Sequence, residues 1–316
     1  MTSSGASAAL VAAVDIGGTG IKGGLLEGNR ILLRTTTPTH TASGPDGVLQ
    51  SVLTALADMV ASAPDGTTVA GLGVVSPGTV DEARGVVIDA ENLGWHDVPL
   101  AEIVRNELGL PVGFGHDVRA GGLAEWRYGA GVDAEDLIFL PVGTGIAAAL
   151  VLGGRLLSSG GYAGEIGHGG PAPRRTSSPG ADLACPCGAT GCPETFASAA
   201  GMARRYEMLT GTSVDGAAEV LTRQLDGDPV AATVWDDAVA GLGELVSDLV
   251  RVTGVSRIVI GGGLVGAGDH LLEPLRRQVS TALTVHRAPR IVPAQLGADA
   301  GLYGASLIGW QAVRAA

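Results

Sequence analysis

Short apolar runs bounded by glycine alternate with longer amphipathic stretches along most of this chain. The apolar runs predict buried strands, at residues 8–14, 69–75, 111–114, 137–142 and 256–260. Apolar residues at helical spacing predict helices, at residues 48–63, 100–108, 118–128, 231–253 and 271–279. Residues 171–182 are rich in Pro, Arg and Ser and predict an irregular loop. This alternation indicates an α/β fold.

One pattern of apolar and glycine positions occurs twice. The tetrapeptide Gly-Thr-Gly-Ile stands at residues 18–21 and again at 143–146. Each copy follows an apolar run and leads into a second apolar run, a short turn and a third apolar patch. Four identical residues could be coincidence in a chain with 51 glycines, but the matched surroundings favour duplication. We therefore expect two related halves.

Glycine turns between strands expose backbone N–H groups on one side, which suits anion binding. Two such hairpins facing each other across a cleft would hold a polyphosphate, whereas the simpler interpretation is two ordinary hairpins whose glycines adopt positive φ. Asp15 directly precedes the first turn, and its carboxylate would repel phosphate unless a divalent cation lay between them. Magnesium commonly provides that link, so Asp15 favours a nucleotide site over an ordinary turn.

Composition and charge narrow the class of protein. A chain of 316 residues is long enough for two domains. A net charge of −12 and a pI near 4.8 argue against a nucleic-acid partner. The sequence shows no convincing targeting segment and no apolar stretch of membrane-spanning length. Cysteines without a disulfide framework predict a cytoplasmic protein.

All three cysteines, Cys185, Cys187 and Cys192, lie within eight residues, and His168 lies upstream. Three thiolates and one imidazole would complete the tetrahedral shell that zinc prefers. Three unrelated reduced thiols are the alternative, which the clustering makes improbable. The predicted zinc loop lies between two carboxylates in the sequence, Glu165 and Glu194.

A dinucleotide site is a competing interpretation, because Gly261, Gly263 and Gly266 form G-x-G-x-x-G after a predicted strand. That fingerprint normally opens its domain and is followed by an acidic residue at a strand end. Here only about fifty residues remain and a helix follows. These glycines would instead let an adenine or ribose lie against the backbone.

Together these motifs resemble the ROK sugar kinases. The segments that carry the resemblance are Asp15-Ile-Gly-Gly-Thr19, Gly143-Thr-Gly145, Glu165-Ile-Gly-His168, the cysteine loop through Glu194, and Gly261-Gly-Gly263. The resemblance implies an α/β fold of the actin-like ATPase superfamily, with two ribonuclease-H-like domains, a cleft between them and a zinc-binding loop. We expect a small domain over residues 8–118 plus a C-terminal helix at about 300–316, and a larger domain over 119–299.

The resemblance also implies roles for individual residues. Asp117 would be the general base, and the zinc ligands would be His168, Cys185, Cys187 and Cys192. The sugar would contact Gly78, Asn92, His116, Asp117, Glu165, His168 and Glu194. ATP with Mg²⁺ would bind at Asp15, Gly17, Gly18, Thr19, Lys22, Gly143, Thr144, Gly145, Gly261, Gly262 and Gly263. Asp117 also suits the N-terminus of the helix predicted from Val118, and capping is compatible with catalysis.

The chain departs from the family pattern around the base, where His116-Asp117-Val118-Arg119 replaces Asn-Asp-x-Asn. The contact of His116 with sugar is therefore open, and Arg119 is either a surface residue or the partner of a carboxylate. We expect ATP-dependent phosphorylation of the 6-hydroxyl of glucose, as in bacterial glucokinases. The alternatives are N-acetylglucosamine, N-acetylmannosamine, mannose or fructose as substrate, polyphosphate as donor, a sugar-responsive regulator without a DNA-binding domain, or a purely structural zinc protein. We also expect a homo-dimer or tetramer with no nucleic-acid or membrane partner.

Overall fold

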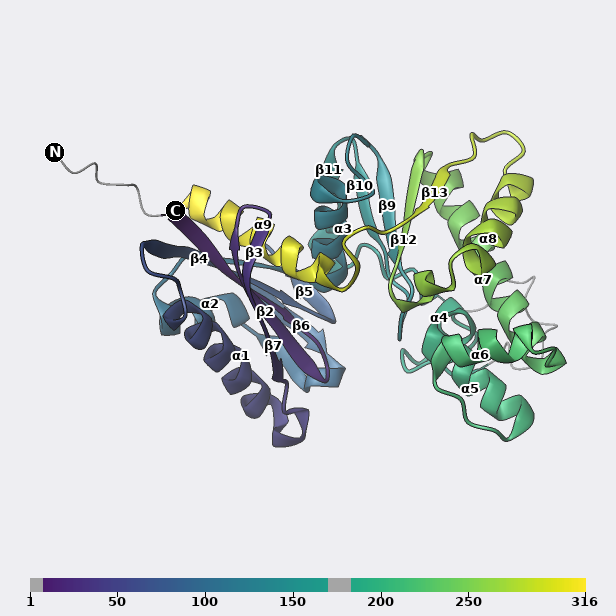
Figure 1. The fold of residues 1–316 in the computed structure, drawn as a ribbon, viewed down its shortest axis with the longest axis horizontal. Coiled ribbons are helices and arrows are strands. Elements are labelled where there is room, and N and C mark those ends of the chain that lie inside the picture. The colour runs from purple at the N-terminus through teal and green to yellow at the C-terminus, as the bar shows by residue number, and fades with distance from the viewer. Residues whose placement is uncertain (1–7, 170–182) are drawn as a thin grey trace. The chain divides into compact units, whose positions relative to one another are not determined.

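The structure, a computed structural model, describes residues 8–169 and 183–316 (Figure 1). The predicted loop at 171–182 lies outside the described residues. The chain forms two compact units. The first unit holds the chain up to Tyr128, Ser158–Ala163 and Ala298–Ala316, and the second unit holds Gly129–Leu157 and Gly164–Gly297.

The first unit contains a five-stranded sheet with the strand order β3-β2-β1-β4-β8. Its strands are β1 (Ala8–Ile16), β2 (Gly20–Glu27), β3 (Arg30–Pro38), β4 (Thr67–Ser76) and β8 (Val112–His116). Strands β1 to β3 form an antiparallel meander, while β4 and β8 run parallel to β1. Its helices are α1 (Gly44–Ala61), α2 (Leu100–Leu108), α3 (Asp117–Tyr128) and α9 (Ala300–Ala315).

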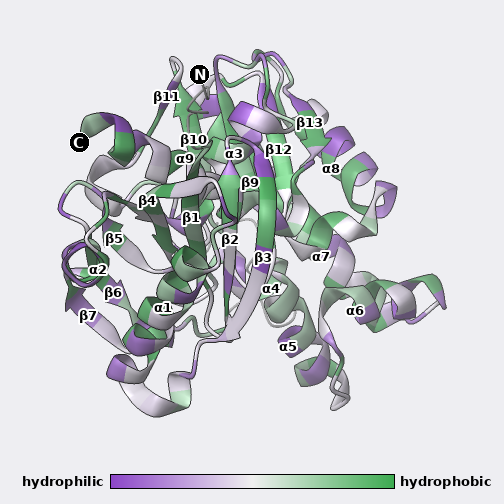
Figure 2. Cartoon of the chain, turned by 60° about the vertical axis from the view of Figure 1, so that its left-hand side comes forward, coloured by the Kyte–Doolittle hydropathy of each residue, from purple (hydrophilic) through white to green (hydrophobic). Residues whose placement is uncertain are grey.

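Both faces of this sheet are buried, which explains why β1 is continuously apolar instead of alternating. Leu10 and Val14 pack in one core with residues of α1 and α2. Val11 and Ala13 point to the opposite face and pack with Ala120 of α3 and residues of α9. The strands β1 and β4 are accordingly mostly green in the hydropathy view (Figure 2). The core is almost entirely aliphatic, as the low aromatic content requires.

The second unit repeats this sheet, with the strand order β11-β10-β9-β12-β13. Its strands are β9 (Leu137–Pro141), β10 (Ala149–Leu152), β11 (Arg155–Leu156), β12 (Arg257–Gly261) and β13 (Arg290–Pro293). Its helices are α4 (Pro193–Ala197), α5 (Ala199–Thr210), α6 (Gly216–Leu225), α7 (Pro229–Thr253) and α8 (Asp269–Ala282). Again the first three strands form a meander and the last two run parallel to the first. The duplicated sequence pattern therefore corresponds to a duplicated sheet topology.

The sequence patterns did not predict the small antiparallel sheet of the first unit. It consists of β5 (Thr79–Asp81), β6 (Val86–Ala90) and β7 (Trp95–Val98). The helices α4, α5 and α6 were also not anticipated. Within the described ranges, no helix combines the length and the apolar composition needed to cross a membrane.

Candidate functional site

In the first unit the predicted site residues gather at one edge of the sheet. Strands β1, β4 and β8 are parallel, and the register pairs Asp15 with Val75 and Ser76 with His116. The carboxyl ends of the three strands therefore lie level with one another, which is where ligands bind in open α/β sheets. Asp15, the turn after β1 and the His116–Asp117 pair all lie at that edge.

Asp15 lies half-buried beside the first turn of α9. Burial raises the pKa of its carboxyl, and the nearby Lys22 ammonium opposes that rise. Gly301 makes this position possible, because a Cβ there would lie 2.3 Å from the Asp15 Oδ2 atom. Lys22 donates a hydrogen bond to the backbone oxygen of Ala298, 3.2 Å away. A carboxylate oxygen is a ligand that Mg²⁺ accepts, so Asp15 fits the predicted magnesium link.

The turn after β1 is closed by the Gly17 N–H, which donates to the Gly20 oxygen at 3.0 Å. Thr39 braces the turn from outside, since its hydroxyl donates to the Gly17 oxygen at 2.6 Å. Thr19 is exposed beside Gly18. The Asn92 amide nitrogen lies 3.3 Å from the position of a Cβ on Gly18. The structure thus brings Asn92, predicted at the sugar, next to the predicted phosphate turn.

Gly78, also predicted to contact the sugar, has a clear conformational reason to be glycine. Its φ is +87°, and a Cβ would lie 2.2 Å from the Asp89 backbone oxygen. Close packing of the chain against β6 therefore requires glycine at this position, with or without a sugar.

Asp117 is the first residue of α3. Its Oδ1 atom accepts a hydrogen bond from the Val118 N–H at 2.6 Å and lies 3.3 Å from His116 Nε2. The Arg119 guanidinium is 1% exposed and donates to Glu82 at 2.8 Å. It also donates to the backbone oxygens of Gly161 and Ala163. Arg119 is thus the partner of a carboxylate and is buried.

The second glycine turn, Gly143 to Ile146, is held by a carboxylate from a distant segment. The Ile146 N–H donates to Glu194 Oε2 at 2.9 Å, and a Cβ on Gly145 would lie 2.5 Å from that oxygen. The Gly143 N–H donates to the Gly145 oxygen at 3.1 Å. Thr144 is exposed at the tip.

The Gly261–Gly263 run packs against Val142, the residue that precedes this turn. Gly262 has a φ of +75°, and a Cβ there would lie 2.4 Å from the Val142 oxygen. The Leu264 N–H donates to the same oxygen. Gly262 and Gly263 are exposed, so bare backbone is available for a flat ligand beside the second turn.

Glu165 and His168 lie in one turn, because the His168 N–H donates to the Glu165 oxygen. Gly167 within that turn packs so closely on Ile146 that a Cβ would lie 2.2 Å from the Ile146 oxygen. The Glu194 N–H donates to the Gly167 oxygen at 3.1 Å. Glu165, His168 and Glu194 therefore belong to one group with the second glycine turn.

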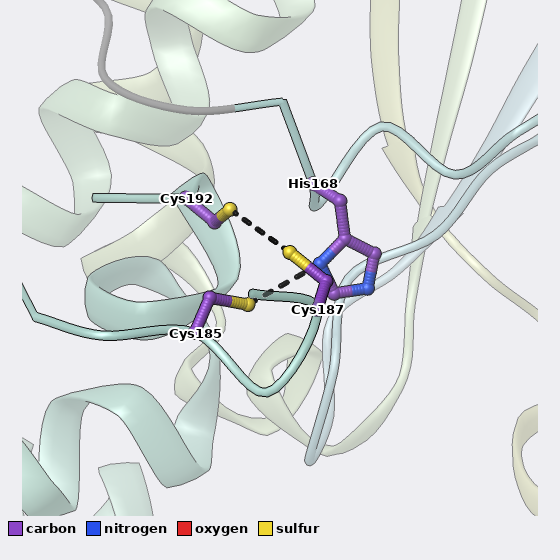
Figure 3. Close-up of side chains that lie close together, drawn as sticks. All are labelled: His168, Cys185, Cys187 and Cys192. Atoms are coloured by element: carbon purple, nitrogen blue, oxygen red, sulfur yellow. Dashed lines mark hydrogen bonds between the residues drawn. The ribbon is translucent and has the colours of Figure 1, made fainter. Parts of the chain in front are cut away.

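The metal-binding cluster predicted from the sequence is assembled in the second unit (Figure 3). One ligand atom from each of His168, Cys185, Cys187 and Cys192 lies within 4.8 Å of every other. The Cys187 and Cys192 sulfurs are 3.6 Å apart, and Cys185 Sγ lies 3.4 Å from His168 Nδ1. Tetrahedral zinc with bonds of about 2.3 Å to sulfur and 2.0 Å to nitrogen requires separations of about 3.8 and 3.5 Å. Burial raises the pKa of the Cys185 thiol, so a cation is needed to favour its thiolate. The cluster fits zinc in both geometry and chemistry.

The predicted residues thus fall into two groups, one in each unit. The first unit carries Asp15, Gly17, Gly18, Thr19, Lys22, Gly78, Asn92, His116 and Asp117. The second unit carries Gly143, Thr144, Gly145, Glu165, His168, the three cysteines, Glu194 and Gly261–Gly263. Glu82, Thr39 and Gly301 were missed, since each contacts its partner across a long stretch of sequence and belongs to no motif.

The duplicated sheets, each with a glycine turn at its carboxyl edge, are the α/β fold of the actin-like ATPase superfamily, in the form found in ROK sugar kinases. The profile described as "ROK family" matches residues 11–312, and the chain belongs to the ROK family.

Relatives of the chain are similar over nearly their full length. The glucokinase of Halalkalibacterium halodurans is 32% identical, over 94% of this chain and 93% of the relative. The crystal structure of the ROK hexokinase from Thermus thermophilus is 32% identical with a TM-score of 0.84, over 97% of this chain and 100% of that one. A ROK glucokinase from Streptomyces griseus, solved with glucose and AMPPNP, is 30% identical with a TM-score of 0.79, over 96% and 99%.

Proposed function

We propose that this chain is a kinase that transfers the γ-phosphoryl group of ATP to the 6-hydroxyl of glucose or a close relative. The observation that carries the proposal is Asp117, which begins α3 at the same sheet edge as Asp15 and its glycine turn, in a member of the ROK family. The ROK glucokinase solved with glucose and AMPPNP supports both substrate classes.

In this proposal Asp117 accepts the proton of the attacking sugar hydroxyl. The hydrogen bond from the Val118 N–H to Oδ1 fixes the carboxylate at the start of α3. The Asp117 side chain is 32% exposed, so a substrate can reach it. Positioning and charge neutralisation supply most of the acceleration in phosphoryl transfer, and a general base adds about 10²- to 10⁴-fold.

The phosphates of ATP would bind the glycine turns. Mg²⁺, when bound at Asp15, neutralises phosphate charge. At the second turn, the backbone N–H groups of Thr144 and Gly145 would donate hydrogen bonds to the phosphates. The exposed backbone of Gly262 and Gly263 would lie against adenosine. The contact of Gly262 with Val142 places this backbone beside the second glycine turn.

Sugar hydroxyls would donate to Glu165 and Glu194, since ionised carboxylates accept hydrogen bonds from hydroxyls strongly. Glu194 holds the second glycine turn through Oε2, which leaves Oε1 for the sugar. Zinc bound to His168 and the three cysteines would hold Glu194 in place, because Cys192 lies two residues before Glu194. We assign this zinc a structural role, as all four positions of its shell are protein ligands.

The test is a coupled assay of ADP release with the purified protein, Mg²⁺ and ATP or polyphosphate. The sugar panel comprises glucose, mannose, fructose, N-acetylglucosamine and N-acetylmannosamine. We expect ATP with glucose to give the highest kcat/KM. A higher kcat/KM with N-acetylglucosamine or N-acetylmannosamine would change the proposed substrate, while the proposed phosphoryl transfer would stand. Absence of turnover with every sugar, combined with tight sugar binding, would favour a sugar-responsive regulator instead.

The remaining parts of the proposal concern the whole protein. We propose a cytoplasmic homo-dimer or tetramer that acts on small molecules. Light scattering of the purified protein distinguishes these assemblies from a monomer.

A further inference from the structure

Thr39 makes two hydrogen bonds to the glycine turn after β1, although it belongs to none of the motifs that carry the family resemblance. It directly follows β3, whose last residue, Pro38, pairs with Gly20 at the end of the turn. The Thr39 hydroxyl donates to the Gly17 oxygen at 2.6 Å. The Thr39 backbone N–H donates to the Thr19 oxygen at 3.3 Å. Two carbonyl groups of the turn are therefore tied to one residue.

Thr39 is out of reach of any ligand, because it is 0% exposed. Gly18, in the middle of the turn, is half-buried, and Thr19 is exposed. A nucleotide can thus meet the turn but not Thr39. Any effect of Thr39 on nucleotide binding must pass through the backbone of the turn.

The hairpin itself closes without Thr39. Strands β1 and β2 pair continuously up to Ile16 and Ile21, and the Gly17 N–H donates to the Gly20 oxygen at 3.0 Å. These contacts set the register and close the turn. The two hydrogen bonds from Thr39 add a constraint on how the peptide groups inside the turn are rotated.

That rotation decides which backbone groups an anion meets. The Gly17 carbonyl and the Gly18 N–H belong to one planar trans peptide, so they point in opposite directions. Holding the Gly17 oxygen on the Thr39 hydroxyl therefore holds the Gly18 N–H away from Thr39. A carbonyl oxygen on the side of the phosphates would repel them, whereas an N–H attracts them. The hydrogen bond to the carbonyl also polarises the shared peptide and strengthens its N–H as a donor.

We propose that Thr39 is a positioning residue, which keeps the Gly18 N–H turned toward the phosphates of ATP by holding the Gly17 carbonyl on the opposite side. The inference rests on the proposed kinase activity. It adds to that activity a buried hydroxyl that touches neither ATP nor sugar and acts on nucleotide affinity.

The test uses three matched variants. Thr39→Val keeps the β-branched shape and the backbone N–H but removes the hydroxyl, and Thr39→Ser keeps the hydroxyl. Thr37→Val is the control, since Thr37 lies in the same strand and pairs with Ile21. In the part of the chain that the structure describes, the Thr37 hydroxyl makes no hydrogen bond. Calorimetry measures the Kd of MgAMPPNP and of the sugar that the wild type prefers, and steady-state kinetics measure KM for MgATP.

We expect Thr39→Val to raise the Kd of MgAMPPNP and the KM for MgATP by about 10- to 100-fold, which corresponds to one hydrogen bond to a charged group. The Kd of the sugar should stay within about threefold, and so should every constant in Thr39→Ser and Thr37→Val. A purely structural role would instead lower the number of binding-competent molecules for both ligands and leave both Kd values unchanged. That result would overturn the proposal, as would an equal rise in both Kd values.

A second measurement needs no variant and no turnover. In amide NMR of the labelled wild type, MgAMPPNP should shift the Gly18 resonance, and an unshifted Gly18 amide would overturn the inference even if Thr39→Val does not fold. Wild-type protein that binds MgAMPPNP with this shift but phosphorylates no sugar would refute the proposed function and support the role of Thr39. An active wild type whose Thr39→Val variant binds MgAMPPNP normally would refute the role of Thr39 alone.

Discussion

Replacing Gly301 with Ala tests whether the close approach of α9 positions Asp15. The new Cβ would lie 2.3 Å from Asp15 Oδ2 and 2.7 Å from Cγ, whereas ordinary contacts begin at 3.4 Å. The carboxylate must therefore move by about 1 Å, and a misplacement of that size costs about 100-fold in rate. The backbone of α9 is not strained by the change, since Ala is favoured over Gly in helices by up to about 1 kcal/mol.

We expect Gly301→Ala to lower kcat/KM for MgATP by about 100-fold while the free energy of unfolding stays within about 1 kcal/mol of wild type. Gly309→Ala in the same helix is the matched control. Its Cβ would lie 2.7 Å from Val11 Cγ1 and 3.0 Å from the Gly73 nitrogen, so it should cost about 1–3 kcal/mol of stability and spare the activity of the folded fraction. Full activity in Gly301→Ala would show that Asp15 is not held in this way.

Three further predictions address the metal, the pH dependence and Arg119. Chelation should lower the melting temperature and release about one zinc per chain, because a closed structural site contributes to folding; an unchanged melt with no metal in the preparation would contradict the zinc assignment. The pKa of His116 falls from 6.5 to about 3 on folding, so the unfolded chain takes up a proton in that range and the folded chain does not. Stability should therefore fall as the pH drops from about 6.5 towards 3, and urea titrations should show a shallower decline in His116→Asn. Arg119→Met should lower the free energy of unfolding by about 3 kcal/mol, since it leaves Glu82 and two backbone oxygens without their buried donor. The same urea titrations at neutral pH measure this loss. A loss below about 1 kcal/mol would mean that water replaces the guanidinium.

The sequence predicted the elements whose patterning is local. The strand beginning at Ala8 and the helix Leu100–Leu108 follow directly from apolar runs and helical spacing. The sheet β5-β6-β7 was missed because its strands are as short as three residues and pair through turn-rich sequence. Pairing between short strands depends on tertiary packing more than on local propensity.

Among the site residues too, those that are close in the sequence were predicted, and those brought together by tertiary packing were not. The spacing of Cys185, Cys187 and Cys192 indicated a shared metal, because the ligands are close in the sequence and one turn brings them together. The contact between Arg119 and Glu82 joins residues that are 37 positions apart, and no motif contains both. The approach of Gly301 to Asp15 likewise depends on the packing of α9 against β1, which the sequence pattern does not specify.

The central claim is that Asp117 removes the proton from the sugar hydroxyl. Single-turnover transfer from radiolabelled ATP to glucose, measured beside glucose binding by calorimetry, tests it in the wild type and in Asp117→Asn. The amide oxygen of Asn can still accept the Val118 N–H, so we expect glucose binding within a few-fold of wild type and transfer slower by about 10²- to 10⁴-fold. Transfer at the wild-type rate in Asp117→Asn would contradict the account.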